Sequence, residues 1–291
     1  MTETAVQAAA TAARALGLTV TDPTVLYEAF STVVHLKPSP VVARVPMNLP
    51  EALQEPEPAV QRQQREIDVM TWLDAQGVPV VQPSHPVPVE RDGLCMTFWK
   101  YVEVDQAAEP DYVGATARVA ELHAQLATYP GELPWMVPLR LIGSGLATTE
   151  AVPGLLEQED LDRARAEWKV LEPILTSQSR FQAAFEGTVV QPIHGDAPSW
   201  NLINTADGPL WADFEDVTIG PREWDLAGFG PDLCRAYGAR LDPEVQQLMD
   251  HARALQVLVC TPLVPQFPAL ADGIRMFADR WRSMPFAAGL G

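Results

Sequence analysis

A cluster of polar residues at fixed spacing, set in otherwise apolar sequence, constrains this 291-residue chain most strongly. The cluster begins with His194-Gly195-Asp196, continues with Asn201 and ends with Asp213-Phe214-Glu215. A lone His-Gly-Asp is usually a tight turn. The complete set at this spacing is far more specific and is typical of a site that carries out chemistry.

The segment between Asn201 and Asp213 predicts a β-hairpin. Residues 202–204 and 210–212 read as two short strands, and 205–208 reads as a turn that closes with Asp-Gly. Because Asn201 precedes the first strand and Asp213 follows the second, their side chains are expected together at the open end of the hairpin. Two oxygen donors at one place suit Mg²⁺, which takes few protein ligands and completes its shell with water and phosphate.

An aspartate followed by an asparagine and a second aspartate is the arrangement used for phosphoryl transfer in kinases. In that template the first aspartate accepts the proton of the acceptor hydroxyl, while the asparagine and the second aspartate hold Mg²⁺. We therefore predict Asp196 as the catalytic base, Asn201 and Asp213 as metal ligands, and ATP and Mg²⁺ as cofactors.

The composition is that of an ordinary globular protein, with 47% apolar and 20% charged residues. No apolar run is long enough to span a bilayer, and the N-terminus lacks the pattern of a secretory signal. The three cysteines, Cys95, Cys234 and Cys260, are isolated and odd in number. They form neither a metal-type pair nor a disulfide framework, which favours a reducing cytoplasm. The lack of a spanning apolar run favours no membrane association.

The net charge is −18 and is unevenly distributed. Residues 1–102 carry 7 Lys and Arg against 11 Asp and Glu, whereas residues 103–291 carry 13 against 27, so their net charges are −4 and −14. This acidity argues against nucleic acid as a partner. It would attract a cationic small substrate, or it serves solubility alone.

The order of elements indicates an α+β chain with two lobes. Helices are expected at 5–17, 59–75, 111–128, 159–175, 223–239, 243–259 and 268–282, and strands at 24–29, 32–36, 41–45, 78–81, 87–90 and 94–98. Strands followed by helices predict an N-terminal nucleotide-binding lobe over 1–102 and a mainly helical catalytic and substrate-binding lobe over 103–291, with the nucleotide in the cleft between them. The sequence carries no signal for the oligomeric state.

Three segments together resemble the aminoglycoside phosphotransferase family: His194-Gly-Asp with Asn201, Asp213-Phe-Glu-Asp, and Gly220-Pro-Arg-Glu-Trp-Asp-Leu-Ala. The resemblance is strongest over 190–230, is looser over the first hundred residues and fades after 230. It implies a protein-kinase-like fold and a kinase that uses ATP and Mg²⁺ to phosphorylate small-molecule hydroxyls.

The resemblance also implies roles for individual residues. It matches Asp196 to the catalytic base, and Asn201 and Asp213 to the metal ligands. It matches His194 to a support of the catalytic loop and Asp225 to an aspartate that braces this loop. Alternatively, His194 is a core histidine and Asp225 is a residue at a helix start.

Arg44 stands on the third strand, where kinases place a phosphate-binding lysine. Arginine keeps the charge but is not interchangeable with lysine. Glu66 shares a helix face with Met70 and Leu73, so its carboxylate needs a buried cation, and Arg44 is the candidate partner. The alternatives are a plain edge-strand arginine and an exposed pair of Glu66 with Arg62.

The segment 28–32 departs from the family because it contains no glycine-rich phosphate loop. Ser31 and Thr32 are the candidates to replace this loop. The run Phe98-Trp99-Lys100-Tyr101 resembles the linker between lobes, where backbone groups meet the adenine edge, although aromatic residues there also serve for packing.

Four residues near the cluster are candidates for binding the acceptor: Ser199, Trp200, Glu215 and Asp216. Trp200 is otherwise a core aromatic residue and Asp216 a solvated loop residue. The carboxylates of Glu215 and Asp216 could also hold a second Mg²⁺.

Three functions are compatible with these residues. The first is a kinase for a small-molecule hydroxyl, on an aminoglycoside, an amino sugar or another polar alcohol. The second is a nucleotide-binding module without catalysis, favoured by Arg44 and the missing glycine loop. The third is a metal-dependent hydrolase using His194, Asp196 and Asp213, although such sites usually contain more histidine ligands.

Overall fold

The structure is a computed structural model that describes residues 2–46, 49–54, 56–197 and 201–287. Contacts within the chain divide it into two units. The first unit consists of Met1–Pro50, Gln54–Pro110 and Trp200–Glu215, and the second of Glu51–Leu53, Asp111–Ser199 and Asp216–Gly291. The segment Trp200–Glu215 thus belongs with the N-terminal segments, while the functional lobes expected at 1–102 and 103–291 stay a prediction.

The first unit is built on a five-stranded antiparallel sheet in the order β1-β2-β3-β5-β4. Its strands are β1 (Val20–Glu28), β2 (Ser31–Pro38), β3 (Val41–Pro46), β4 (Val89–Arg91) and β5 (Leu94–Lys100). β4 and β5 form the predicted hairpin, with Arg91 opposite Leu94. Asp92 and Gly93 at its turn have positive φ angles of 53° and 76°, as such tight hairpins require.

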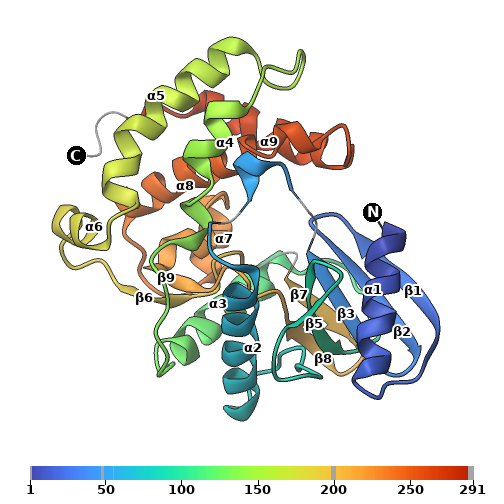
Figure 1. Ribbon diagram of the computed structural model, residues 1–291. Coiled ribbons are helices and arrows are strands. Elements are labelled where there is room, and N and C mark those ends of the chain that lie inside the picture. Colours follow the sequence, from blue (N-terminus) through green and yellow to red (C-terminus); the bar gives the residue numbers. More distant parts are fainter. Residues whose placement is uncertain (1, 47–48, 55, 198–200, 288–291) are drawn as a thin grey trace. The chain divides into compact units, whose positions relative to one another are not determined.

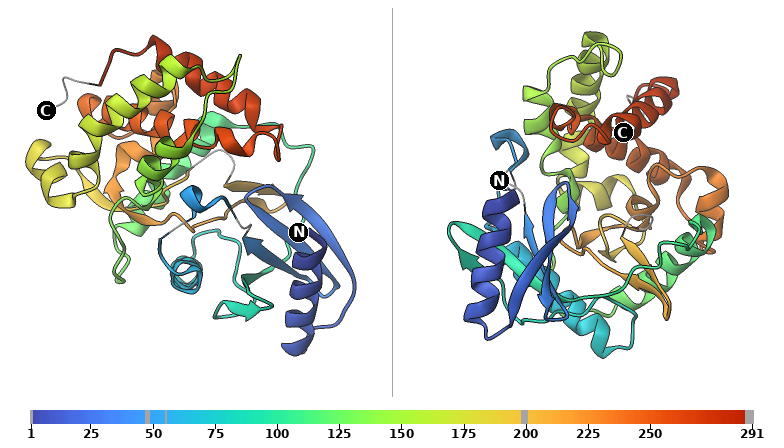
Figure 2. Two further views of the ribbon diagram at one scale, coloured as in Figure 1. Left: turned by 45° about the horizontal axis from the view of Figure 1, so that its top comes forward. Right: turned by 90° about the vertical axis from the view of Figure 1, so that its right-hand side faces the viewer.

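Helix α1 (Thr2–Ala15) runs along one face of this sheet (Figures 1 and 2). Its buried side chains are all alanines, which lets the helix approach the strands closely. They form one core cluster with apolar residues of the sheet, including Ala43, Val45, Met96 and Phe98. Side chains alternate along a strand, so Arg44, between Ala43 and Val45, belongs to the opposite face of β3.

Helix α2 (Ala59–Ala75) supplies the partner of Arg44 and has the bounds that the sequence predicts. Its buried residues include Glu66, Met70 and Leu73, the three that the sequence places on one helix face. The side chain of Gln63 on the same helix donates to the carbonyl of Cys95 at 3.2 Å, which ties α2 to β5.

The predicted hairpin is present as β7 (Leu202–Thr205) and β8 (Gly208–Trp211), paired antiparallel. Trp211 ties it to the rest of the first unit. The Trp211 N–H donates to Pro79 O at 2.9 Å, and the Val81 N–H donates to Trp211 O at 2.8 Å.

The second unit is mainly helical. Its helices are α3 (Tyr112–Leu126), α4 (Ile142–Thr148), α5 (Gln158–Leu175), α6 (Gln178–Ala184), α7 (Pro231–Ala236), α8 (Pro243–Leu258) and α9 (Leu270–Ser283), and η1 (Glu51–Leu53), η2 (Val137–Leu139), η3 (Arg222–Leu226) and η4 (Thr261–Leu263) are short 3-10 turns. Strands β6 (Val190–Ile193) and β9 (Thr218–Pro221) pair antiparallel. They bring the segment before His194 next to the segment before Asp225, which positions the site described below.

Two sequence predictions of elements are wrong. The expected strand at 78–81 is only a single bridge, from Val80 to Trp211. The expected helix at 223–239 is interrupted between η3 and α7, because Gly228 has a φ of 87° and Pro231 starts a new helix. In addition, α4, α6, β6 and β9 are not predicted. Within the described part of the chain, no helix combines the length and the apolarity that crossing a membrane requires.

Candidate functional site

Arg44 is the centre of a cluster of charged side chains in the first unit. Its Nη1 lies 3.1 Å and 2.9 Å from the two carboxylate oxygens of Glu66. Its Nη2 lies 2.8 Å from Asp213 Oδ1 and 2.8 Å from Glu215 Oε2. The predicted Arg44–Glu66 pair is therefore present and buried. The alternative pair of Glu66 with Arg62 is not needed, since Arg62 lies 4.0 Å from Glu215 instead.

The charges of this cluster shift each other's protonation. Burial lowers the pKa of Arg44, but the carboxylates of Asp213, Glu215 and Glu66 raise it by more, so its pKa lies well above the ordinary value. Burial raises the pKa of Glu215, but Arg44 lowers it by more, so the net shift is downward. Burial raises the pKa of Glu66, and the charge of Arg44 opposes this shift. Arg44 thus remains a fixed cation among carboxylates.

Asn201 and Asp213 flank the two strands at the open end of the hairpin. The N–H of Ala212 donates to Asn201 O at 2.9 Å, which holds the two ends of the hairpin together. Asp213 has a φ of 60°, a left-handed conformation that aspartate tolerates better than most residues. An aspartate carboxylate and an asparagine amide are oxygen donors, so this pair fits a magnesium ion. Their role as metal ligands stays a prediction.

The loop that contains Asp196 lies in the second unit and is braced by Asp225. The buried Asp225 carboxylate accepts the N–H groups of His194 and Gly195, each at 2.9 Å. It also lies 2.8 Å from Nε2 of His123, whose Nδ1 lies 2.9 Å from the Tyr237 hydroxyl. Burial raises the pKa of Asp225, but the hydrogen bond and charge of His123 lower it by more, so the net shift is downward.

The backbone of this loop permits little substitution. Gly195 has a φ of 92°, and a Cβ added there would lie 2.1 Å from Asp216 O. The indole of Trp224 donates to Gly195 O at 2.6 Å. The N–H of Asp196 donates to Nδ1 of the fully buried His194 at 3.2 Å, so this nitrogen is the unprotonated one. The predicted bracing by Asp225 is thus present, and His194 acts both as a core residue and as a support of the loop.

Arg253 is a contact of Asp196 that the sequence pattern does not predict. Its Nη1 lies 3.1 Å from Asp196 Oδ1, and its Nη2 lies 3.3 Å from Gly195 O. It comes from α8, where most residues face the core. A signal did exist, because Arg253 is the sole Lys or Arg of α8 and an ionised side chain on such a helix needs a partner.

The other predicted nucleotide-binding residues are placed as follows. Ser31 and Thr32 are buried at the start of β2, which follows β1 after two residues only. The N–H groups of Lys100 and Tyr101 donate to Gln82 O and Pro40 O, each at 2.9 Å.

The aromatic residues of the same run are packed. Phe98 and Trp99 are buried, and the ring of Tyr101 stacks on His35 with 3.9 Å between centroids. Packing is therefore one role of the run 98–101, and its contact with adenine stays a prediction.

Two of the four residues predicted to bind the acceptor lie within the described part of the chain. Ser199 and Trp200 lie outside the described residues. Glu215 is joined to Arg44, and Asp216 lies against Gly195 through its backbone. A role of Glu215 and Asp216 in binding the acceptor stays a prediction. Over the described residues, no three His, Cys, Asp or Glu side chains are grouped as a metal-dependent hydrolase would require.

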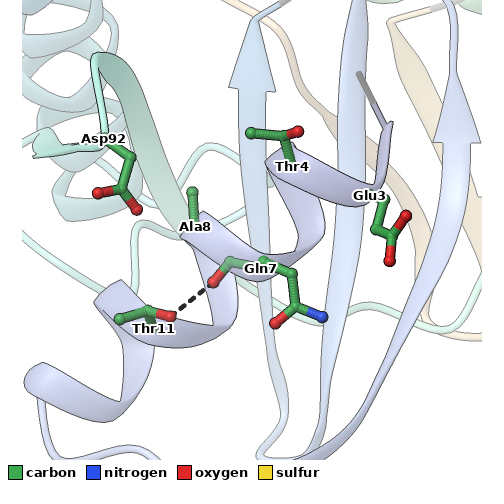
Figure 3. Close-up of a pocket in the computed structure, with 6 residues that line it drawn as sticks. All are labelled: Glu3, Thr4, Gln7, Ala8, Thr11 and Asp92. Atoms are coloured by element: carbon green, nitrogen blue, oxygen red, sulfur yellow. Dashed lines mark hydrogen bonds between the residues drawn. The ribbon is translucent and has the colours of Figure 1, made fainter.

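A pocket of about 410 Å³ opens beside α1 in the first unit, lined by Glu3, Thr4, Gln7, Ala8, Thr11 and Asp92 (Figure 3). Asp92 points from the turn after β4 toward the helix, and the Thr11 hydroxyl donates to Gln7 O. None of the predicted site residues lines this pocket, so it gives no support to a nucleotide site there.

The sequence matches the model of the phosphotransferase enzyme family over residues 33–265. This range contains Arg44, Glu66, Asp196, Asn201 and Asp213, and it covers well over half of the chain. No curated protein matches the sequence at a significant level.

Solved structures show the same fold at low sequence identity. A choline/ethanolamine kinase family protein from Mesorhizobium loti is 18% identical, with a TM-score of 0.60, and the match covers 99% of this chain and 97% of that one. A thermostable mutant of aminoglycoside phosphotransferase APH(4)-Ia is 15% identical, with a TM-score of 0.60 and coverage of 96% and 98%. Amicoumacin kinase hAmiN, solved with AMP-PNP and Ca²⁺, is 12% identical, with a TM-score of 0.60 and coverage of 96% and 94%. The predicted protein-kinase-like fold is thereby confirmed.

Proposed function

The chain belongs to the phosphotransferase enzyme family, whose members act on small-molecule hydroxyls, and from this premise we propose that it transfers the γ-phosphate of ATP to a hydroxyl of a polar small molecule. The comparison structures act on acceptors as different as choline and aminoglycosides, by their names, so they support the reaction type rather than one acceptor. The AMP-PNP bound to hAmiN supports a nucleoside triphosphate as the donor.

Asp196 is the base in the proposed reaction. The acceptor oxygen forms a bond to the γ-phosphorus while the bond from this phosphorus to the β–γ bridging oxygen breaks, so ADP leaves with that electron pair. The proton of the acceptor hydroxyl passes to the Asp196 carboxylate. The side chain of Asp196 is 53% exposed, which makes it accessible to an alcohol, while its backbone is fixed through His194 and Gly195.

Asp213 and Asn201 are the residues that would hold Mg²⁺. When bound, the ion would neutralise charge on the phosphate oxygens. The chain's own contribution is to present an amide and a carboxylate at the mouth of one hairpin, where the main-chain bond between Ala212 and Asn201 limits their separation.

Arg44 is proposed to bind phosphate oxygens of the nucleotide, with Glu66 holding it in place. The bidentate contact with Glu66 uses Nη1 and leaves Nη2 directed at Asp213 and Glu215. A guanidinium fork can keep one carboxylate while its other nitrogen exchanges carboxylate for phosphate. A lysine ammonium can also contact a carboxylate and a phosphate, but it lacks the planar geometry that fixes the direction of each guanidinium contact.

The observation that carries the proposal is the braced loop at Asp196. Asp225, His194 and Trp224 hold four main-chain groups on three successive residues, so the base is fixed in orientation before any substrate binds. Such preorganisation is what phosphoryl transfer needs, because catalysis there is mostly positioning and charge neutralisation.

The test is ADP formation from ATP and Mg²⁺ across a panel of aminoglycosides, amino sugars and simple alcohols. We expect acceptor-dependent ADP that disappears in Asp196→Asn and persists in Asp232→Asn, a matched change on the exposed face of α7. ADP formation that is equal in both variants would contradict the proposal. No ADP with any acceptor, together with intact nucleotide binding, would favour a binding module without catalysis.

A further inference from the structure

The catalytic carboxylate in the second unit is already paired with a cation. Arg253 Nη1 lies 3.1 Å from Asp196 Oδ1, and the Arg253 side chain is only 9% exposed. A guanidinium at this distance cancels most of the charge that Asp196 would present to an approaching molecule. An alcohol whose hydroxyl reaches Asp196 therefore comes within a few ångströms of a fixed positive charge.

Three further contacts keep the guanidinium in this place. Nη2 donates to Gly195 O at 3.3 Å, and Nη1 donates to Gln256 Oε1 at 2.7 Å. The guanidinium carbon lies 4.2 Å from the ring centroid of Trp224. Gln256 is in turn held by a bond from its Nε2 to Pro138 O at 3.2 Å. Arg253 is thus part of the packed structure, and an acceptor would not displace it cheaply.

Cys260 follows α8 and is close enough to Asp196 to interact with its charge, but it adds no negative charge of its own. Burial raises the pKa of Cys260 to about 11, with a further contribution from Asp196, so the thiol is neutral at physiological pH. Cys260 therefore does not offset the positive charge of Arg253.

The wider charge pattern of the C-terminal helices points the same way. Residues 243–283, which span α8 and α9, contain four Asp and Glu and four Arg, so the whole acidic excess of the second half of the sequence lies between 103 and 242. Three of these carboxylates have arginine partners: Asp250 with Arg280, Asp272 with Arg275 and Asp279 with Arg282. These residues therefore add no net negative charge that would attract a polyamine.

We propose that Arg253 positions Asp196 and selects against amine-bearing acceptors, so that the natural acceptor is an uncharged polar alcohol rather than an aminoglycoside or amino sugar. The inference rests on the proposed phosphoryl transfer at Asp196 and narrows its substrate class. It reverses what the net charge of residues 103–291 alone suggests, because Arg253 places a positive charge beside the base.

The experiment compares matched acceptors that differ by one amine, such as D-glucose with D-glucosamine and further neutral polyols with their amino analogues. Turnover numbers and Michaelis constants are measured for wild type, Arg253→Gln, Arg253→Lys and Arg275→Gln. The last variant removes one exposed arginine of α9 as a control for total charge. Thermal unfolding of each variant establishes that it folds.

In wild type, kcat/KM should favour the neutral member of a pair by about tenfold or more. In Arg253→Gln this preference should fall by about tenfold, equivalent to about 1.4 kcal/mol. In the same variant, kcat for the neutral acceptor should be lower than in wild type, while KM for ATP stays within about a factor of two or three of the wild-type value. Arg253→Lys should restore much of the preference, and Arg275→Gln should leave it unchanged.

Three outcomes would overturn the inference: a wild-type preference for the amine, an unchanged preference in Arg253→Gln, or faster turnover of the neutral acceptor in that variant. The wild-type preference is decisive even if Arg253→Gln does not fold. These outcomes are distinct from failure of the proposed function, because each is a ratio of kcat/KM values or a turnover number and can be measured only if phosphate is transferred. Failure of the function itself would show as no acceptor-dependent ADP from either member of any pair.

Discussion

Arg44 and Asp213 form an ion pair in which Nη2 lies 2.8 Å from Oδ1, while Nη1 of the same guanidinium is bound to both oxygens of Glu66. One buried cation on β3 thus connects α2 with the residue that follows the hairpin. With Glu215 included, three carboxylates share this cation. The arrangement makes Arg44 important for folding of the first unit as well as for binding phosphate.

Replacing Arg44 by methionine should leave three neighbouring carboxylates without their cation. We expect a loss of about 3–5 kcal/mol in the free energy of unfolding, as for other buried pairs that lose one partner. Arg44→Lys should lose less stability and should raise KM for ATP by about tenfold, because an ammonium lacks the fixed planar fork that holds Glu66 through one nitrogen and leaves the other for phosphate. Urea unfolding and steady-state kinetics measure the two effects. Arg91→Met, on an exposed strand end, serves as the control, and an Arg44→Met variant as stable as this control would show that the cluster contributes little.

Asp213→Asn should abolish the dependence of nucleotide binding on Mg²⁺. Asparagine tolerates the left-handed backbone at this position, so the hairpin should survive the change, whereas a magnesium ligand loses its charge. Titration calorimetry with a non-hydrolysable ATP analogue, with and without Mg²⁺, measures this. Asp92→Asn is the matched control, because Asp92 also has a positive φ but lies in the exposed β4–β5 turn. If magnesium enhanced nucleotide binding equally in both variants, Asp213 would not be a ligand.

Asp225→Asn should destabilise the loop around Asp196. It should also remove the part of the unfolding free energy that depends on Asp225 being ionised. Burial raises the pKa of Asp225, but His123, His194 and Arg253 together lower it by more, so the folded pKa lies below that of the unfolded chain. The ionised carboxylate therefore stabilises the fold above the unfolded pKa of about 4, and this contribution is lost as pH falls through the folded pKa. At pH 7 we expect a cost of about 3 kcal/mol in urea unfolding.

The same comparison at low pH checks whether folding lowers or raises the pKa of Asp225. The difference in unfolding free energy between wild type and Asp225→Asn should shrink as the pH is lowered below about 4. A difference that grows with acidity would mean that Asp225 is protonated in the native state, and the bracing by charge would then be wrong.

The three cysteines should react slowly with thiol reagents in the folded protein. Burial raises the pKa values of Cys95 and Cys260 to about 11 and also raises that of Cys234. At pH 7.5 a thiol with such a pKa is roughly 0.1% ionised or less, and the thiolate is the reactive form. Titration with Ellman's reagent should show slow reaction in buffer and fast reaction of all three thiols in guanidinium chloride. One thiol that reacts rapidly in buffer would contradict the raised pKa values.

Much of the first unit follows from local sequence patterns. Asp207-Gly208 and Asp92-Gly93 predict their hairpins, and Asp92, Gly93 and Gly208 adopt positive φ angles there. Helix α2 is predicted with correct bounds, and Glu66 on its apolar face predicts a buried cation. In each case the signal is local, and the partner can be inferred from the cost of an unpaired buried charge.

Much of the second unit does not follow from local patterns. Strands β6 and β9 have four residues each and pair with each other across 24 intervening residues, so neither is stable or recognisable alone. Arg253 reaches Asp196 from 57 residues away. The predicted helix at 223–239 is wrong for a local reason instead, because Gly228 has a φ of 87° and Pro231 starts a new helix.

The most direct test of the account separates binding from chemistry at Asp196. Transfer of radiolabelled γ-phosphate to an accepted alcohol is measured in a single turnover for wild type and Asp196→Asn, and nucleotide affinity is measured on the same samples. The account predicts that Asp196→Asn binds nucleotide within about threefold of wild type but transfers phosphate about 10²–10⁴-fold more slowly. Transfer at the wild-type rate by a folded Asp196→Asn protein would contradict it.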